Sequence, residues 1–350
     1  MGRIRKMFAG GNTSLGFYSF FDFIIGDDAE QVFLLKGGPG TGKSVFMKEI
    51  AEAVLKAGYE GELFYCSSDR ESLDGAAFPQ LGVALIDATA PHAQEPRLPG
   101  CRDELINLGN FWNRQGIRKH RKAVEKASLE NQRWFQSAFR YLRAAYAVEE
   151  NIEMWNRSVI SPDKGYEIGT ELLDRIFRCQ GNEKGSIRHL FASAITPQGK
   201  VSFIENLVEG FEERYILEGP LGVEKSVLLQ RILNRAREMG IKAEAFHYPL
   251  NPEKIEHILL PELQVAIISA ADHDFLKSLE GHRINLAQDF PEEDWLSDDY
   301  ALREQLIQRA IHMLGGAKEV HDELESYYAS QMDFAALDEL KETVLGRILG

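Results

Sequence analysis

Residues 31–54 read QVFLLKGGPGTGKSVFMKEIAEAV, and this stretch decides the fold. An apolar run at residues 32–35 has the length of a buried strand, and a helical pattern of apolar positions follows residue 44. Between them lies the glycine-rich pattern G-x-x-x-x-G-K-S at residues 37–44. A strand, this loop and a helix in this order predict a P-loop, in which backbone N–H groups and a helix N-terminus bind phosphate.

The loop is expected to make several kinds of contact with a nucleotide. Its glycines allow the backbone to curl so that the N–H groups face one anion. Lys43 is expected to reach the β- and γ-phosphates, and the Ser44 hydroxyl to bind Mg²⁺. The alternative is a glycine-rich turn in which the lysine is incidental. The predicted cofactors are ATP and Mg²⁺. The predicted nucleotide-binding residues are Gly37, Gly38, Pro39, Gly40, Thr41, Gly42, Lys43, Ser44 and Val45.

A second copy of this stretch lies later in the chain. Shifted by 182 residues, the region falls on residues 215–274 without a gap, and the lysine and serine of the loop fall on Lys225 and Ser226. Further upstream the shift becomes 183, where FAGGNTSLG from residue 8 matches FASAITPQG from residue 191. Two unrelated α/β segments would not easily hold one register over such a length. We therefore predict a tandem duplication.

The boundary between the copies is expected near residues 180–188, in the polar sequence CQGNEKGS. A chain of 350 residues is long enough for two domains, which we place at residues 1–187 and 188–350. The first would contain a basic helical insertion at about 110–160, and the second a helical tail over residues 299–349, broken at Gly315-Gly316. One possibility is that the N-terminal strands of the two copies pair across the boundary.

Strand and helix alternate within the first copy. After the P-loop helix, residues 62–66 and 83–86 read as strands, and residues 104–108 read as a fourth strand that is echoed at residues 283–286. Such alternation predicts a parallel sheet covered by helices, with ligands at the carboxyl ends of the strands. The predicted class is an α/β P-loop NTPase fold, duplicated in tandem, with a helical insertion or tail in each copy.

Residues 117–161 contain neither Gly nor Pro and are expected to be helical. Apolar residues recur there in steps of four and three, the heptad pattern of a helix that packs on another helix. We interpret the pattern as the core of a helical hairpin. Its members are Trp134, Ala138, Tyr141, Ala145, Val148, Ile152 and Trp155.

Charge is unevenly distributed along the chain, whose formal net charge is −14. Residues 111–146 hold nine Arg and Lys against two Glu, a net of +7, so the rest of the chain carries −21. General affinity for nucleic acid or an anionic membrane is therefore not expected. The basic stretch could be a lid that brings an arginine to the transferred phosphate, a site for an acidic partner or nucleic acid, or a solvated helix face.

Acidic and histidine residues after the predicted strands are candidates for catalysis. Asp87 ends the apolar run LGVALID, where a carboxylate can hold Mg²⁺; the alternative is a cap on the next turn. Many hydrolytic P-loop ATPases carry a glutamate directly after this aspartate, but Ala88 follows here. The attacking group must then come from elsewhere or be a substrate hydroxyl. His92 could be a base or a γ-phosphate sensor, and Asp69 could be a base or a turn cap.

The second copy departs from the first at two positions that matter for binding. Glu224 replaces the glycine before the lysine, which brings bulk and negative charge towards the β-phosphate. Ser269 stands in the place of Asp87, so the metal ligand is lost. We predict a degenerate second site, so that the second copy is structural or regulatory, or forms a wall of the active site in the first copy. The predicted catalytic residues are those of the first copy, namely Lys43, Asp87, Asp69 and His92.

Cysteine usage and hydropathy indicate the compartment. Cys66, Cys101 and Cys179 are far apart and form no C-x-x-C pair, which favours a reducing environment. The apolar patch at residues 17–25 contains an aspartate and is too short to span a bilayer, and no signal-peptide core follows the N-terminus. We expect a cytoplasmic protein without a membrane partner.

Several segments together resemble a family of bacterial tandem P-loop ATPases, over nearly the whole chain. They are FAGGNTSLGFYSFFD, KGGPGTGKS, CSSDRESLDG and DATAPH, followed by a second copy that begins FASAITPQG. The resemblance implies a cytoplasmic ATP-binding protein with a degenerate second copy. It does not imply a substrate.

The sequence supports three functions. The first is a Mg²⁺-dependent ATPase that acts through the first copy only and switches the basic insertion between states. The second is a small-molecule or nucleotide kinase with the insertion as its lid, which Ala88 favours because it removes the usual water-activating residue. The third is a non-catalytic scaffold that senses ATP.

Overall fold

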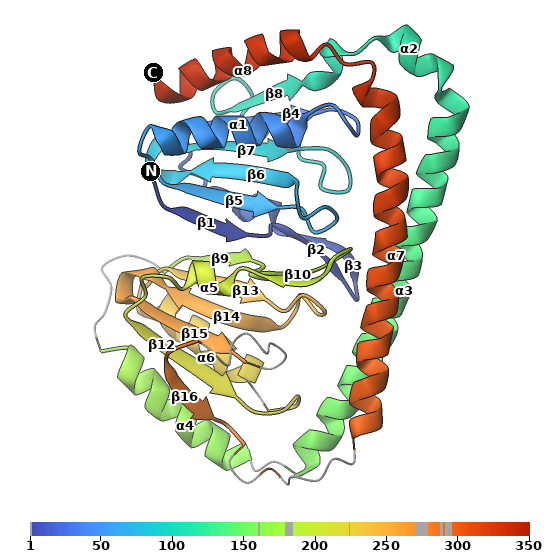
Figure 1. Cartoon of the computed structure of the whole chain (residues 1–350). Helices are drawn as coiled ribbons and strands as arrows, with labels where there is room; N and C mark the ends of the chain where they lie inside the picture. The colour runs from blue at the N-terminus through green and yellow to red at the C-terminus, as the bar shows by residue number, and fades with distance from the viewer. Residues whose placement is uncertain are drawn as a thin grey trace.

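The computed structural model describes residues 2–159, 162–178, 185–223, 225–270, 279–287, 290 and 296–350. In this part of the chain, two six-stranded sheets and two short hairpins are accompanied by helices (Figure 1). The expected α/β fold is therefore confirmed. The middle of the expected domain boundary, at residues 179–184, lies outside the described residues, and so does Glu224.

The first sheet has the strand order β1-β5-β6-β7-β4-β8. Its strands are β1 (Ile4–Met7), β4 (Gln31–Lys36), β5 (Gly61–Tyr65), β6 (Leu73–Phe78), β7 (Val83–Asp87) and β8 (Asp103–Asn107). The hairpin strands are β2 (Gly10–Thr13) and β3 (Gly16–Ser19), and the short 3-10 helices are η1 (Phe21–Phe23), η2 (Pro79–Leu81) and η3 (Leu108–Phe111). Helix α1 (Lys43–Lys56) connects β4 to β5.

Strand β4 shows why this sheet is buried on both faces. Successive side chains of a strand point to opposite faces. Val32 and Leu34 accordingly join one buried cluster, whereas Phe33 and Leu35 join another that includes apolar residues of α1 and of α8 (Phe334–Leu349). A continuous apolar run is therefore required at β4, as the sequence shows.

The prediction of a parallel sheet is wrong for one strand, because β6 runs antiparallel to both of its neighbours, β5 and β7. The chain leaves β5 through a turn at residues 66–72 and returns directly beside it, so no helix crosses the sheet at this point. The sequence of β6, LDGAAF, contains no β-branched residue and gives no strand signal. The sheet is therefore mixed, with the other neighbouring pairs parallel.

The second sheet repeats this strand order as β9-β13-β14-β15-β12-β16, and β14 is its antiparallel strand. Its strands are β9 (Ile187–Leu190), β12 (Glu213–Glu218), β13 (Ala243–His247), β14 (Ile255–Leu260), β15 (Val265–Ser269) and β16 (His282–Asn285). They are accompanied by the hairpin strands β10 (Ser193–Thr196) and β11 (Gly199–Ser202), by α5 (Ile204–Leu207) and α6 (Lys225–Glu238), and by the 3-10 helix η4 (Pro261–Leu263).

The two halves of the molecule meet through pairs of residues in matching positions. Phe8 and Phe191, which follow β1 and β9, exchange both backbone hydrogen bonds at 2.9 and 3.0 Å. Pairing across the boundary, one of the possibilities raised by the sequence, is thus present as a single antiparallel bridge.

An ion-pair cluster lies beside this bridge. Arg5 of β1 and Arg188 of β9 each contact both Glu62 of β5 and Glu244 of β13, at 2.5 to 3.5 Å. Burial opposes the charge of Glu62, but the two guanidinium groups hold its pKa below the ordinary value. Each half therefore supplies one arginine and one glutamate to the same interaction.

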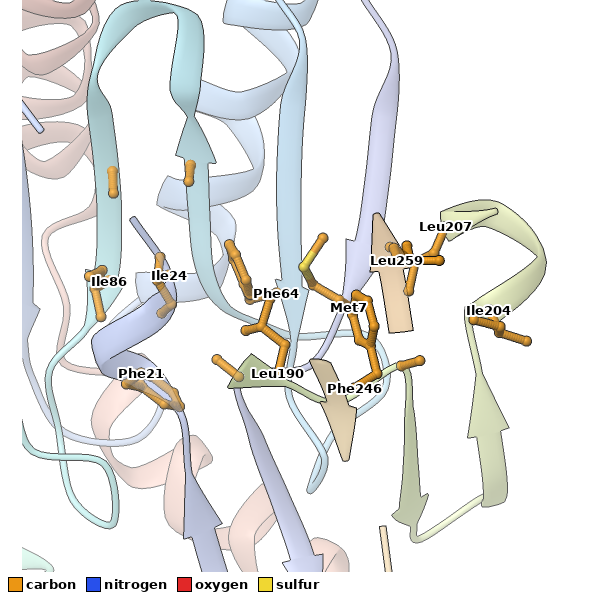
Figure 2. Packing of buried hydrophobic residues seen from close by; sticks show 14 of the residues in the cluster. Met7, Phe21, Ile24, Phe64, Ile86, Leu190, Ile204, Leu207, Phe246 and Leu259 are labelled. Atoms are coloured by element: carbon orange, nitrogen blue, oxygen red, sulfur yellow. The ribbon is translucent and has the colours of Figure 1, made fainter. Parts of the chain in front are cut away.

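A shared apolar core completes the contact between the halves. Figure 2 shows Met7 and Phe64 of the first half in one cluster with Leu190 and Phe246 of the second. The cluster is contiguous across both sheets, so neither half has a separate core on this side.

Two long antiparallel helices connect the ends of the molecule, and we call them the arm helices. They are α3 (Arg121–Val159), which follows α2 (Arg114–Lys119), and α7 (Ser297–Ala329) (Figure 1). The packing partner of α3 is therefore α7 and not a second helix of the insertion, so the interpretation as a helical hairpin is wrong. Ala138, Ala145 and Ile152 of the predicted heptad pattern are buried, whereas Trp155 is 44 % exposed.

Each arm helix is followed by a helix that packs on the other half. Helix α4 (Pro162–Ile176) follows α3, and its Leu172 and Ile176 join the cluster around α6 in the second half. Helix α8 follows α7, and its Leu337 and Val344 join the cluster around α1 in the first half. The two halves therefore exchange their C-terminal helices.

Helix α7 is continuous through Gly315 and Gly316, where a break was expected. A Cβ atom added to Gly316 would lie 2.8 Å from ring atoms of Trp134 on α3. The absent side chain therefore makes room for an indole ring between the arm helices. The helix ends instead at Ala329, before the turn that leads to α8.

Candidate functional site

Loop one, residues 37–44, joins β4 to α1 at the carboxyl end of the strand. Gly40 and Gly42 have φ angles of +66° and +85°, in the left-handed region that favours glycine. Gly42 is the N-cap residue of α1, so the helix begins directly at Lys43. Loop one thus turns sharply into a helix N-terminus, an arrangement that can present backbone N–H groups and the helix dipole to one anion.

The ammonium group of Lys43 folds back onto loop one. Its Nζ donates to the carbonyl oxygens of Gly37 and Gly38, both at 3.0 Å, and lies 3.6 Å from Oδ2 of Asp87. The side chain is only 12 % exposed. The ammonium group is therefore fixed against the loop, with a carboxylate beside it.

Asp87 lies at the end of β7, which pairs directly with β4. Its Oδ1 accepts from the N–H of Thr89 at 2.9 Å and from the Thr89 hydroxyl, so one oxygen caps the following turn. The other oxygen, Oδ2, faces Lys43. The turn-cap role of Asp87 is therefore present, and its role as a Mg²⁺ ligand stays a prediction.

Ser44, the second expected metal ligand, lies in the first turn of α1. Its Oγ accepts from the N–H of Leu73 at 2.9 Å. Among the residues that the structure describes, no group of three or more His, Cys, Asp and Glu side chains is placed to hold a metal. A hydroxyl and one carboxylate suit Mg²⁺, which keeps several waters and takes its other ligands from phosphate oxygens.

Asp74 is a buried acid of this site that the sequence reasoning missed. It lies on β6, is 4 % exposed, and its Oδ2 has no hydrogen-bond partner. Burial raises its pKa to about 6; the neighbouring His92 opposes this shift and Asp87 adds to it. The only signal in the sequence is an aspartate in a short run of small and apolar residues. The antiparallel course of β6 places this aspartate near Asp87.

His92 lies behind Asp87 and is buried. Its Nδ1 is 2.9 Å from the carbonyl oxygen of Asp87, and its Nε2 is 3.8 Å from Oδ1 of Asp74. The ring stacks on Phe21 with the centroids 4.3 Å apart. If Nδ1 donates to the carbonyl, Nε2 is available to share a proton with Asp74. The role of His92 as base or sensor stays a prediction.

Asp69 lies in the turn between β5 and β6. Its Oδ1 accepts from the N–H of Glu71 at 3.1 Å, and its Oδ2 accepts from the hydroxyl of Ser72 at 2.8 Å. Lys318 of α7 approaches the same carboxylate at 3.8 Å. Asp69 therefore orders its own turn and contacts an arm helix, and its role as a base stays a prediction.

The end of α7 covers loop one. A Cβ atom added to Gly40 would lie 2.5 Å from the carbonyl oxygen of Glu325 and 3.0 Å from its Cα, so the helix backbone packs directly on this glycine. The pKa of the Glu325 carboxyl is lowered by a hydrogen bond to His321 and also by one from the Gly40 N–H. A negative side chain of the second half thus lies close to the backbone of loop one. No local sequence pattern predicts this contact, because Gly40 and Glu325 are far apart in the chain.

Loop two, residues 219–226, has a similar shape in the part that the structure describes. Gly222 has a φ of +87°, and Nζ of Lys225 donates to the carbonyl oxygen of Gly219 at 2.5 Å. At the end of β15, Ser269 occupies the position of the aspartate, and its N–H donates to Nδ1 of His257 at 3.2 Å. Loop two therefore has the folded-back lysine, and Ser269 stands where the first half has the carboxylate of Asp87.

Helix α3 covers loop two as α7 covers loop one. A Cβ atom added to Gly222 would lie 2.6 Å from the carbonyl oxygen of Glu153 and 3.0 Å from its Cα. Nδ2 of Asn156 donates to the carbonyl oxygen of Leu221 at 2.8 Å. Each loop is therefore covered by the backbone of an arm helix that begins in the other half.

A buried polar network lies where the arm helices meet the second half. Glu149 of α3, which is fully buried, accepts from Arg303 of α7 and from the hydroxyl of Tyr248, both at 2.8 Å. Lys254 lies 2.5 Å from Glu153. Burial raises the pKa of Glu149 although Arg303 and Lys254 oppose the shift. This network fixes α3 and α7 to the second half.

The nine basic residues of the stretch 111–146 are exposed on α2 and α3. Arg121 forms an ion pair with Glu125 at 2.7 Å. On α3, Lys126, Arg133 and Arg140 recur every seven residues and so share one side of the helix. The buried positions Ala138, Leu142 and Ala145 lie on another side, towards α7. The stretch therefore presents an outward basic face.

Comparison of the chain with protein-family models, with curated proteins and with solved structures finds no match. The resemblance to tandem P-loop ATPases therefore stays a prediction from the sequence. None of the helices in the described ranges has the length and apolar character needed to cross a bilayer.

Proposed function

We propose that the first half binds Mg²⁺-ATP at loop one and hydrolyses it. The observation that carries the proposal is the position of Lys43, which is held by two carbonyl groups of a glycine loop and lies 3.6 Å from the carboxylate at the end of the adjacent strand. This arrangement places a cation, a hydroxyl and a metal-binding oxygen at one helix N-terminus. Those are the groups that phosphate and Mg²⁺ require.

Hydrolysis also needs a group that takes a proton from water. We assign this role to Asp74, which is buried on the strand beside that of Asp87 and lies 3.8 Å from Nε2 of His92. Burial raises its pKa to about 6, close to the operating range of a general base. His92 beside it could receive the proton. This assignment replaces the glutamate that is absent after Asp87.

The test compares two lysines that make the same contact in the two loops. Lys43→Ala should weaken ATP binding by at least about a hundredfold, because the ammonium group that lies on loop one is removed. Lys225→Ala is the matched control and should leave ATP affinity within about twofold. Equal weakening by both variants, measured by calorimetry, would show that nucleotide binding is not confined to the first half.

A scaffold that senses ATP without turnover is the second candidate. The contact between Gly40 and Glu325 favours it, because a phosphate that uses the same N–H group must displace part of α7. Phosphate release that is independent of any acceptor supports the ATPase. ADP formation that depends on a nucleoside or metabolite supports the kinase alternative, and tight binding with neither supports the scaffold.

We also propose that the two halves arose by tandem duplication of a P-loop NTPase. The identical strand order and the cluster of two equivalent arginines and two equivalent glutamates support this origin. Two equivalent units that meet through the same residues resemble the two subunits of a symmetric dimer joined into one chain. The absence of a carboxylate at Ser269 supports a non-catalytic second half.

The outward basic face of α3 is proposed as a contact for an acidic partner or nucleic acid. Its support is the exposure of Lys126, Arg133 and Arg140 on one side of a long helix. Replacing these three residues by Glu should abolish any salt-sensitive binding to a random-sequence oligonucleotide. If the unaltered protein binds no oligonucleotide at low salt, the nucleic-acid form of this proposal is wrong.

A further inference from the structure

A cleft next to loop one is formed by residues of both halves. It is open to solvent, has a volume of about 620 Å³, and is lined by residues 110–113, which follow β8, and by residues 330–333, which join α7 to α8. Neither segment is assigned a role in the phosphate site described above.

The two sides of the cleft are held together by backbone hydrogen bonds. The N–H of Asn113 donates to the carbonyl oxygen of Gln331, and the N–H of Asp333 donates to that of Phe111, both at 2.8 Å. Asn113 also caps α2 through its Oδ1, and Asp333 caps α8 through a bond from Ala336 at 3.1 Å. The cleft is therefore a fixed part of the fold.

Aromatic residues connect the cleft to loop one. Trp112 lines the cleft, and its ring centroid lies 5.7 Å from that of Tyr328. A Cβ atom added to Gly38 would lie 3.2 Å from Tyr328 and 3.5 Å from Trp112. Both rings therefore lie close to Gly38 of loop one, where they leave little room for a side chain.

The topology of the sheet decides on which side of loop one the rest of a nucleotide would lie. Strand β4 has β7 on one side and β8 on the other. The β7 side carries Asp87, and behind it His92 and Phe21 pack closely. The β8 side leads to the cleft. A nucleotide with its phosphates in loop one and its metal near Asp87 therefore extends towards β8.

We propose that the cleft binds the nucleobase of the nucleotide, stacked against Trp112. This inference rests on the proposed function, because it requires the phosphates in loop one. A base offers a flat aromatic face and an edge of donors and acceptors. The amide groups of Asn110, Asn113 and Gln331 line the cleft. Those of Asn110 and Gln331 can donate and accept, whereas Asn113, whose Oδ1 caps α2, can donate. Stacking favours a purine, whose face is the larger.

The test separates base from phosphate by comparing ATP with ribose 5-triphosphate, which lacks the base. Loss of one stacking partner typically weakens binding about ten- to hundredfold. Trp112→Ala should weaken ATP binding by this factor and weaken the binding of ribose 5-triphosphate by much less. Trp112→Phe should restore ATP affinity to within about threefold. Trp155→Ala, at an exposed tryptophan near the other end of α3, is the control and should change neither affinity.

The outcomes distinguish the two proposals. Equal weakening of both ligands by Trp112→Ala, or no weakening of ATP, overturns the base site and leaves the ATPase proposal intact. Failure of the unaltered protein to bind either ligand overturns both. A readout that needs no variant is the comparison within the unaltered protein, which should bind ATP at least about tenfold more tightly than ribose 5-triphosphate. Equal affinity would also overturn the base site.

Discussion

Asp74 is a residue whose charge is disfavoured in the folded protein. Its pKa is raised to about 6 from an ordinary value of 3.8, chiefly by burial. Between these values the folded state holds a proton that the unfolded state has lost. The stabilisation linked to this proton is therefore complete below pH 4 and is lost as the pH rises from about 4 to about 6.

Asp74→Asn should remove this pH dependence, because the amide does not titrate. Relative to the unaltered protein, the variant should gain up to about 3 kcal/mol of unfolding free energy between pH 4 and pH 7. Urea unfolding at the two pH values measures the change. Asp338→Asn, on the exposed side of α8, should show none. A constant difference between variant and unaltered protein would contradict the burial argument.

The charge of Glu325 leads to a second prediction, which concerns ATP affinity. Its carboxylate lies close to the backbone N–H of Gly40 in loop one, where phosphate charge is expected, and this N–H helps to lower its pKa. Glu325→Gln removes a like charge at a partly exposed position, so ATP affinity should rise about three- to fivefold. Glu323→Gln is the control and should have no effect, because the Glu323 carboxylate accepts a hydrogen bond from the hydroxyl of Tyr327 on the same helix. Unchanged or weaker binding by Glu325→Gln would argue that this carboxylate does not compete with phosphate.

Among single residues, the sequence identifies those that belong to a local pattern. The spacing of Lys43 and Ser44 is visible because both lie in one loop, and Asp87 is visible because it ends an apolar run. Asp74 and Glu325 belong to no such pattern. Asp74 lies at the site because β6 runs antiparallel, and Glu325 lies there because an arm helix of the other half packs on loop one. Neither arrangement can be predicted from the residues next to them in the sequence.

At the scale of elements, two adjacent glycines of α7 should respond in opposite ways to the same change. A Cβ atom at Gly315 meets no atom within 4 Å, whereas one at Gly316 meets the ring of Trp134 at 2.8 Å. Gly315→Ala should stabilise the protein by about 0.5–1 kcal/mol through helix propensity. Gly316→Ala should destabilise it by about 1–2 kcal/mol through overpacking. Thermal unfolding of both variants is the measurement, and equal shifts would disprove the tight contact between the arm helices.

The same elements show what the sequence predicts well. Residues 32–35, 62–66 and 83–86 alternate or run apolar as buried strands do, and the structure has β4, β5 and β7 there. The heptad pattern predicts that α3 packs on a helix, but it does not identify which helix is the partner. Gly315 and Gly316 suggest a break because glycine is a poor helix former, and here the packing of Trp134 outweighs that propensity.

At the scale of the whole molecule, the ion-pair cluster between the sheets should contribute to the stability of both halves together. Arg188→Met leaves the buried Glu62 and Glu244 with Arg5 alone and should lower the unfolding free energy by about 3 kcal/mol. Because the core is shared, the loss should appear as a lower midpoint of a single transition. Arg347→Met, which breaks the exposed pair with Glu104, should cost less than about 1 kcal/mol. Two separate transitions in the Arg188 variant would show that the halves are energetically independent.

The arm helices place a second requirement on the glycines of both loops, because each helix packs on the loop of the other half. Gly222 accommodates the backbone of α3 at Glu153 just as Gly40 accommodates α7 at Glu325. A larger residue at Gly222 would push an arm helix away from the second half, whether or not a phosphate binds there. Substitutions in the second copy should then accumulate first at positions that are constrained by ligand binding alone, such as Ser269. Part of a phosphate-binding pattern can in this way outlast the binding of phosphate, preserved by the helices that lie against it.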